Sequence, residues 1–138
     1  MKNITFVDSG KVSPSNPVRQ SLFRFEDEGK YKALAAAEEL KRIRPDINSL
    51  GLVLTIPMPG HFVLNEAHGQ EIVQSVIQLD KLVQEHDVLY LLTDSRESRW
   101  FPTLLANTYE KVQFFFFTFK KKNNNKYSEI NIMAAKNS

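Results

Sequence analysis

The stretch Asn3-Ile4-Thr5-Phe6-Val7, closed by Asp8, decides the fold class. Its β-branched and aromatic residues predict a short buried strand, and an acidic residue ends it. Residues 9–17 follow as a loop, because Gly10 and Pro17 interrupt regular structure and small polar residues lie between them. The chain is therefore expected to open with a strand whose carboxyl end leads into a polar loop.

Helices and strands alternate after this loop. The remaining predicted elements are, in order, a helix over 30–44, a strand over 50–57, a helix over 66–85, a strand over 87–92 and a helix over 96–106. Glu38 and Arg42 are spaced as an i,i+4 ion pair on the first helix. The apolar run 88–92 suits a central parallel strand. This order calls for right-handed crossovers, so we predict an α/β fold with a Rossmann-like parallel sheet and flanking helices.

Composition excludes several classes of protein. The 138 residues suffice for one domain, and 42% hydrophobic with 25% charged residues is ordinary for a soluble globular protein. The longest apolar runs are far shorter than the ~20 residues that cross a bilayer, and no secretory signal is visible, so we expect a cytoplasmic protein without a membrane span. The chain has no cysteine, which excludes disulfides, thiolate zinc sites and a cysteine nucleophile on this chain.

The net charge of +2 arises near the end of the sequence. Residues 113–138 contain five lysines and one glutamate, whereas residues 1–112 are slightly acidic. Because the body of the chain has no basic stripe, we do not expect it to bind nucleic acid.

Residues 113–138, here called the tail, differ from the rest in composition. Phe, Lys and Asn each occur five times in this stretch. All three are encoded by codons made of A and T, so our preferred explanation is translated non-coding sequence, and a genuine lineage-specific basic tail is the alternative. We expect residues 113–119 to form at most an edge strand, and the remainder to be disordered.

Acidic residues close two of the predicted strands. In open α/β sheets, ligands bind beyond the carboxyl ends of the strands. Asp8 stands where an acid commonly bonds ribose hydroxyls, and Asp94 stands where a carboxylate can hold Mg²⁺. A helix N-cap is the ordinary alternative for an aspartate in such a position.

Two segments carry a family resemblance. Residues 8–20 resemble the D-x-x-x-V-x-x-S-N-x-x-R-Q signature of the ThiF/ubiquitin-activating superfamily, and residues 28–33 resemble its G-x-x-K-A segment. Residues 56–61 and 91–100, the latter containing D-S-R-E-S-R-W, are similar to the branch that activates the ubiquitin-like modifiers of autophagy. The resemblance covers about residues 3–112.

The resemblance implies an ATP-dependent activating enzyme. Intact members adenylate the C-terminal glycine of a ubiquitin-like modifier with ATP and Mg²⁺, and then form a thioester on a cysteine. It implies that Asp8 binds the ATP ribose and Asp94 binds Mg²⁺. The residues implied on the phosphate side are Asn16, Arg19, Gln20 and Lys32. The implied partners are autophagy modifiers and their conjugating enzymes, and the intact family forms homodimers.

The sequence also departs from the family pattern. Gly10 stands where most superfamily members have a second acid, and the five glycines form no G-x-G-x-x-G phosphate loop. We therefore expect residues 1–112 to be a partial ThiF-type adenylation domain that lacks the first βα unit, and the chain to be inactive alone. The alternative is a non-catalytic fragment that binds the modifier or a full-length subunit.

The sequence does not decide between a structural and a functional role for several other polar and aromatic residues. Arg96 and Arg99 are equally compatible with a functional and a structural role. Trp100 is expected to pack in the core or in an interface. The three histidines have no spacing suited to a metal, and solvated loop or helix-end positions are expected for them: they are His61, His68 and His86.

Overall fold

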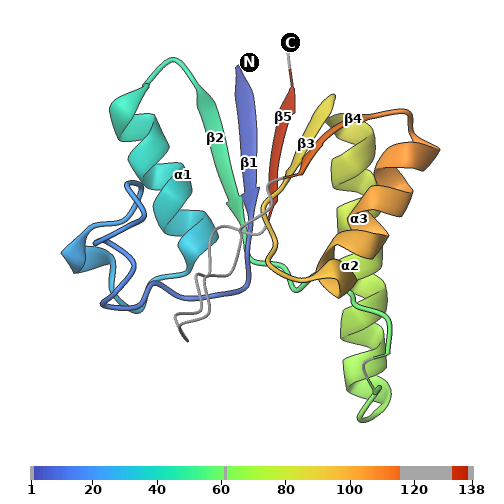
Figure 1. Ribbon diagram of the computed structural model, residues 1–138. Helices are drawn as coiled ribbons and strands as arrows, with labels where there is room; N and C mark the ends of the chain where they lie inside the picture. The colour runs from blue at the N-terminus through green and yellow to red at the C-terminus, as the bar shows by residue number, and fades with distance from the viewer. Residues whose placement is uncertain (1, 61, 116–131, 137–138) are drawn as a thin grey trace.

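The computed structural model describes residues 2–60, 62–115 and 132–136, which form a five-stranded sheet with three α-helices (Figure 1). The elements are β1 (Asn3–Val7), the 3₁₀-helix η1 (Phe25–Asp27), α1 (Lys32–Ile43), β2 (Asn48–Leu52), α2 (Glu66–Glu85), β3 (Val88–Leu91), α3 (Arg96–Thr108), β4 (Val112–Phe115) and β5 (Ile132–Lys136). The predicted α/β class with a partial Rossmann-like sheet is confirmed.

The spatial order of the strands is β2-β1-β5-β3-β4. β1 runs parallel to β2, with Val7 opposite Leu52, and β3 runs parallel to β4. β5 lies between β1 and β3 and is antiparallel to both. The two parallel pairs match the predicted crossovers from β1 to β2 and from β3 to β4. The sheet as a whole is mixed and not all parallel as predicted, because the antiparallel β5 joins the two pairs.

The tail supplies strands at two places. The predicted edge strand is present as β4, which lies at the border of the sheet. The expectation of disorder is wrong for β5, because its backbone finds partners on both sides. For example, the Lys2 amide donates to the Lys136 carbonyl (3.2 Å), and the Asp87 amide donates to the Ala135 carbonyl (3.1 Å). The expectation for residues 116–131 lies outside the described residues.

The second predicted strand is displaced toward the N-terminus. It was expected over 50–57, whereas β2 spans Asn48–Leu52. β1 provides pairing partners for β2 only up to the level of Val7, so the chain beyond Leu52 has no neighbouring strand. Leu54 and Ile56 are instead buried in a core cluster with side chains of α2. Their alternating pattern reflects side-chain packing without strand pairing.

The predicted helices are present with small changes at their ends. α2 has the predicted bounds, and the Asn65 side chain caps it by accepting a hydrogen bond from the His68 amide (2.9 Å). The predicted Glu38–Arg42 pair is wrong. Arg42 donates instead to Glu39, because the i,i+3 geometry lets its guanidinium reach both carboxylate oxygens.

The sheet has a core on each face. Phe6 belongs to the α1-side core, whereas the next residue, Val7, belongs to the α2/α3-side core, as strand alternation requires. The α1-side core consists of Phe6, Val12, Phe23, Ala33, Ala35, Ala36 and Ala37. The α2/α3-side core consists of Val7, Leu54, Ile56, Leu79, Leu82, Val83, Leu89, Leu91, Leu105, Ala106 and Ala134. Figure 1 shows α1 beside β2 and β1, and shows α2 and α3 beside β3 and β4.

Candidate functional site

The candidate site begins at the carboxyl end of β1. Asp8 follows this strand and is 3% exposed. Its Oδ1 accepts a hydrogen bond from the Gly10 amide at 2.6 Å, and its own amide donates to the Leu52 carbonyl at 3.2 Å. A Cβ atom at position 10 would lie 3.0 Å from Asp8 Oδ1, so a larger residue there would crowd the carboxylate. The glycine therefore lets the loop close tightly around Asp8.

Lys32 lies close to this carboxylate. It is the first residue of α1, and its amide donates to the Gly10 carbonyl at 2.9 Å. Its side chain is buried, and this burial lowers the pKa of Lys32. The charge of Asp8 acts in the opposite direction, and the charge of Arg19 lowers the pKa further. The structure thus brings Asp8, Arg19 and Lys32 together in one electrostatic group.

Gly51 explains how Lys32 reaches this position. A Cβ atom at residue 51 would lie 2.4 Å from the Ala33 carbonyl oxygen and 2.8 Å from the Leu34 Cα. The start of α1 therefore packs directly on the backbone of β2, which only glycine allows. The sequence analysis did not single out Gly51, although a glycine inside a predicted strand is a signal of close backbone approach.

Asn16 organises the loop between β1 and η1. It is 1% exposed, and its Oδ1 accepts a hydrogen bond from the Ser13 amide at 2.9 Å. Its backbone carbonyl accepts from the amides of Arg19 (3.0 Å) and Gln20 (2.8 Å). Arg19 is exposed, and Gln20 is half-buried. The structure therefore places Asn16 in the framework that presents Arg19 and Gln20, and a phosphate-binding role for the three stays a prediction.

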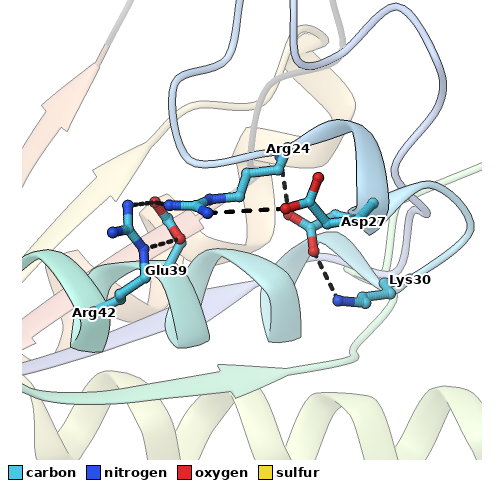
Figure 2. A network of polar contacts seen from close by, with 6 residues as sticks. Arg24, Asp27, Lys30, Glu39 and Arg42 are labelled. Atoms are coloured by element: carbon cyan, nitrogen blue, oxygen red, sulfur yellow. Dashed lines mark hydrogen bonds and ion pairs between the residues drawn. The ribbon is translucent and has the colours of Figure 1, made fainter.

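An ionic network holds the segment before α1 against the helix (Figure 2). Asp27 accepts hydrogen bonds from the Arg24 amide (2.9 Å) and from Lys30 Nζ (2.8 Å). Glu39 on α1 accepts from Arg24 Nη2 (3.2 Å) and from Arg42 Nε (2.9 Å). The bonds from Arg42, reinforced by Arg24, lower the pKa of Glu39 to about 2 despite its burial. Arg24 thus connects both carboxylates and anchors η1 on α1.

Asp94 lies at the same edge of the sheet as Asp8. Val7 and Leu91 are both level with Ile132 of β5, so the chains leaving β1 and β3 emerge side by side. One strand separates them, which places the strand ends about 10 Å apart at about 4.8 Å per strand spacing. Asp94 is exposed and makes no hydrogen bond or ion pair with the described residues. The two acids therefore lie at the same end of the sheet, beyond the carboxyl ends of β1 and β3, without contacting each other.

The residues around Asp94 fit one kind of metal ion. Its carboxylate is accessible, and the neighbouring Thr93 is 1% exposed with a hydroxyl oxygen that has no partner among the described residues. The described part of the chain contains no cluster of three or more His, Asp or Glu side chains suited to a metal. Mg²⁺ is commonly held by one or two carboxylates together with substrate phosphates. The site thus fits Mg²⁺ shared with a phosphate and does not fit a site built from protein ligands alone.

Arg99 has a structural contact. Its Nε donates to the Thr93 carbonyl at 2.8 Å, and its Nη2 donates to the same oxygen, which ties α3 to the end of β3. Arg96 and Trp100 line an open groove of about 430 Å³ beside α3. Trp100 was expected in the core or in an interface, and its exposure of 55% excludes the core.

His86 lies at a helix end, as expected, but it is not solvated. It caps the C-terminal end of α2 but is buried, because both ring nitrogens find partners. Nδ1 donates to the Leu82 carbonyl at 2.8 Å, and Nε2 lies 3.0 Å from the Thr5 hydroxyl. His68 lies in the first turn of α2, where its Nδ1 accepts from the Leu64 amide (3.2 Å). His61 lies outside the described residues.

Comparison with known proteins gives two findings. A family model described as "ThiF family" matches residues 1–121. The chain is also similar to proteins named "Ubiquitin-like modifier-activating enzyme ATG7". The relative from Candida albicans is 51% identical over 118 residues, and those from Dictyostelium discoideum and Homo sapiens are 54% and 47% identical over 115 and 116 residues.

These matches cover 81% of this chain and only 16–18% of each relative. The chain therefore spans less than a fifth of the curated relatives it matches. In the described part of the chain, no helix has the length and apolar character needed to cross a membrane.

Proposed function

The chain belongs to the ThiF family, and from this membership we propose that it is part of the adenylation domain of an autophagy-type ubiquitin-like modifier-activating enzyme. The observation that carries the proposal is the grouping of Asp8, Arg19 and Lys32 at the carboxyl end of a parallel strand. Open α/β sheets bind nucleotides at this edge. The relatives are named as modifier-activating enzymes, and this chain covers only 16–18% of their length, so its activity is inferred from a shared part.

Each residue has a specific part in the proposed reaction. Asp8 accepts hydrogen bonds from the ribose hydroxyls of ATP, while Lys32, Arg19 and Gln20 face the phosphates and Asn16 holds their loop. Asp94 binds the Mg²⁺ that accompanies the phosphates. The C-terminal carboxylate of the modifier attacks the α-phosphorus, the bond to the β-phosphate oxygen breaks, and pyrophosphate leaves. Such a transfer depends mainly on positioning and on cations around the phosphates.

The proposed partners follow from the same membership. They are ubiquitin-like modifiers of autophagy and their conjugating enzymes, with a second copy of the activating enzyme and a cytoplasmic site of action. The thioester step requires a cysteine from elsewhere, because this chain contains none.

A chimera tests the proposal. The 118 residues of the Candida albicans relative that match this chain are replaced by the residues of this chain, and modifier-dependent exchange of pyrophosphate into ATP is measured. Exchange within about tenfold of the parent is expected. A folded chimera that binds the modifier but shows no exchange would contradict the proposal.

Asp94→Ala in that chimera tests the metal assignment. A metal ligand at the phosphates is worth several kcal/mol, so exchange is expected to fall by at least about a hundredfold while modifier binding is retained. Glu97→Ala is the matched control, because it removes an exposed carboxylate three residues away and is expected to leave exchange intact. Near-normal exchange by the Asp94 variant would overturn the assignment.

The chain by itself is expected to bind Mg-ATP no more tightly than about millimolar. The five glycines of this sequence form no G-x-G-x-x-G loop. Such a loop supplies backbone donors worth about 1.5–3 kcal/mol each to a charged phosphate, so three of them correspond to at least about three decades of affinity relative to a site that has the loop. Isothermal titration of the full chain measures this. Saturable binding at tens of micromolar would show that Asp8, Arg19 and Lys32 suffice without the loop.

A further inference from the structure

Asp94 lies between two residues whose backbone is held in place. Thr93, just beyond β3, is 1% exposed, and Ser95 is the N-cap residue of α3. Asp94 itself is exposed, so its side chain is not fixed by packing. The position of its carboxylate therefore depends on how firmly the structure holds the two neighbouring residues.

Arg99 holds the residue before Asp94. Its Nε donates a hydrogen bond to the Thr93 carbonyl at 2.8 Å, and its Nη2 donates to the same oxygen. Both donors belong to one planar guanidinium of rigid geometry. The Thr93 carbonyl oxygen lies in the same planar peptide unit as the amide nitrogen and the Cα of Asp94. Because Arg99 restrains this oxygen from two nitrogens, it also restrains the Cα from which the carboxylate extends.

Ser98 holds the residue after Asp94. Its amide donates to Ser95 Oγ at 3.2 Å, and its hydroxyl donates to the Ser95 carbonyl at 3.0 Å. Ser98 is 8% exposed, so little water competes for these hydrogen bonds. The first two turns of α3 thus restrain the backbone on both sides of Asp94, which leaves mainly its side-chain torsions free.

The two arginines near Asp94 differ in their contacts. Side chains on a helix point back toward its N-terminus, and this direction lets Arg99 reach over the first turn of α3 to Thr93. Arg96, the first residue of α3, is exposed and makes no hydrogen bond or ion pair with the described residues. Of these two cations, Arg99 is therefore the one linked to the backbone beside Asp94.

We propose that Arg99 is a positioning residue, which restrains the Thr93 peptide and thereby fixes where Asp94 presents its carboxylate to Mg²⁺. The proposal rests on the proposed function in one respect, namely that Asp94 binds the metal. Mg²⁺ requires near-ideal octahedral geometry with ligands at about 2.0–2.1 Å, so a mobile carboxylate binds it less well. Residues that orient a metal ligand typically contribute about 10–100-fold to metal affinity. Arg99 acts through Asp94 and touches neither the metal nor the nucleotide.

Amide order parameters from NMR relaxation of the full chain test the positioning without metal or nucleotide. For the Asp94 amide, about 0.85 is expected in the unmodified chain, as in rigid backbone, and less than about 0.6 in Arg99→Gln. The amides of β1 and β3 are expected to stay rigid. Arg99→Lys keeps a donor for the Thr93 carbonyl without the planar fork, so it is expected to give an intermediate value, and it carries the test if Arg99→Gln does not fold.

Arg96→Gln is the matched control, because it removes the same charge from the same helix without removing a bond to Thr93. It is expected to keep the Asp94 amide rigid. An Asp94 amide that stays rigid in the Arg99 variants, or that loosens equally in Arg96→Gln, would overturn the proposal.

The Mg²⁺ dependence of pyrophosphate exchange in the chimera tests the effect on the metal. At saturating ATP, Arg99→Gln is expected to raise the free Mg²⁺ concentration for half-maximal exchange about tenfold, with the KM for the modifier unchanged. A role confined to stability would leave this Mg²⁺ requirement unchanged, and that result would overturn the proposal. If Asp94→Ala loses exchange while Arg99→Gln keeps a normal Mg²⁺ requirement, only the role of Arg99 fails. If Asp94→Ala exchanges normally, the metal assignment in the proposed function fails as well.

Discussion

The two faces of the sheet are packed by different means. On the α1 side the buried residues of the helix are mainly alanines, and Gly51 lets the helix backbone touch β2. On the α2/α3 side the core is rich in leucine, with Leu79, Leu89 and Leu91 at 0–1% exposure. The candidate site lies on the α1 side, where Lys32 starts the helix and faces the end of β1.

The two kinds of packing have different consequences for the geometry of the site and for the stability of the fold. Small side chains bury little area, but they allow two backbones to approach closely and fix the polar groups they carry. Large aliphatic side chains bury more area and contribute more to the free energy of folding. The α1 side therefore sets the geometry of the site, and the α2/α3 side supplies most of the apolar stabilisation.

The strongest test of this division is Leu79→Ala on the α2/α3 side. The side chain is fully buried, so the free energy of unfolding is expected to fall by about 2–5 kcal/mol. Urea unfolding followed by circular dichroism measures the loss, and the amide NMR signals of Gly10 and Lys32 are expected to keep their positions. Leu34→Ala, on the exposed side of α1, is the control. Equal losses for both variants would remove the distinction between the two sides.

The next test is Gly51→Ala on the α1 side. The added Cβ meets the Ala33 carbonyl oxygen at 2.4 Å, so α1 must move, at an expected cost of about 1–3 kcal/mol. Because Lys32 then becomes less buried, its pKa is expected to rise toward the ordinary value, which NMR titration can follow.

Gly69→Ala is the matched control for Gly51→Ala. Among the described residues its Cβ would meet only the Val63 side chain, at 3.3 Å, and alanine is the better residue within a helix. It is expected to be neutral or stabilising. If both glycine variants left Lys32 unchanged, close packing at Gly51 would not be what positions the lysine.

A smaller effect is expected from Thr5→Val, which removes a polar contact on the α2/α3 side. The Thr5 hydroxyl lies 3.0 Å from His86 Nε2, and valine keeps its shape without the hydrogen bond. The expected loss is about 1 kcal/mol in urea unfolding. Thr55→Val, at an exposed position, is expected to change stability by less than about 0.5 kcal/mol. An unchanged midpoint for the Thr5 variant would show that apolar burial alone holds this side.

The smallest effect is the acid dependence of the network around Glu39. Its pKa is about 2 in the folded state against an ordinary 4.5, so the unfolded chain binds more protons in this range. The stabilisation is therefore complete above pH 4.5 and is lost as the pH falls from 4.5 toward 2. Glu39→Gln is expected to flatten this part of a pH series of unfolding midpoints, and Glu38→Gln is expected to keep it. A Glu39 variant that follows the unmodified chain would contradict the assignment.

Local patterns in the sequence predicted much of this molecule. The bounds of α2 follow from its periodicity. The family resemblance of residues 8–20 and 28–33 brought forward Asp8, Arg19 and Lys32, which the structure places together. A glycine in a predicted strand signals close backbone approach, but that α1 packs on Gly51 could not be predicted, because it depends on the distance between β2 and a helix formed by a separate segment. β5 was missed for a similar reason, since its pairing partners are far away in the sequence and its own composition suggested disorder.

The pairing of β1 with β5 also has a consequence for how the chain folds as it is made. Asn3 is opposite Lys136, so β1 finds its neighbour β5 only after the whole stretch between them has been made. Until then β1 with β2 and β3 with β4 can form as two separate two-stranded ribbons, each with an unpaired edge. Contacts of such large sequence separation slow folding and lengthen the time during which strand edges are open to other chains. The newly made chain thus depends on β5 to join the two ribbons into one sheet.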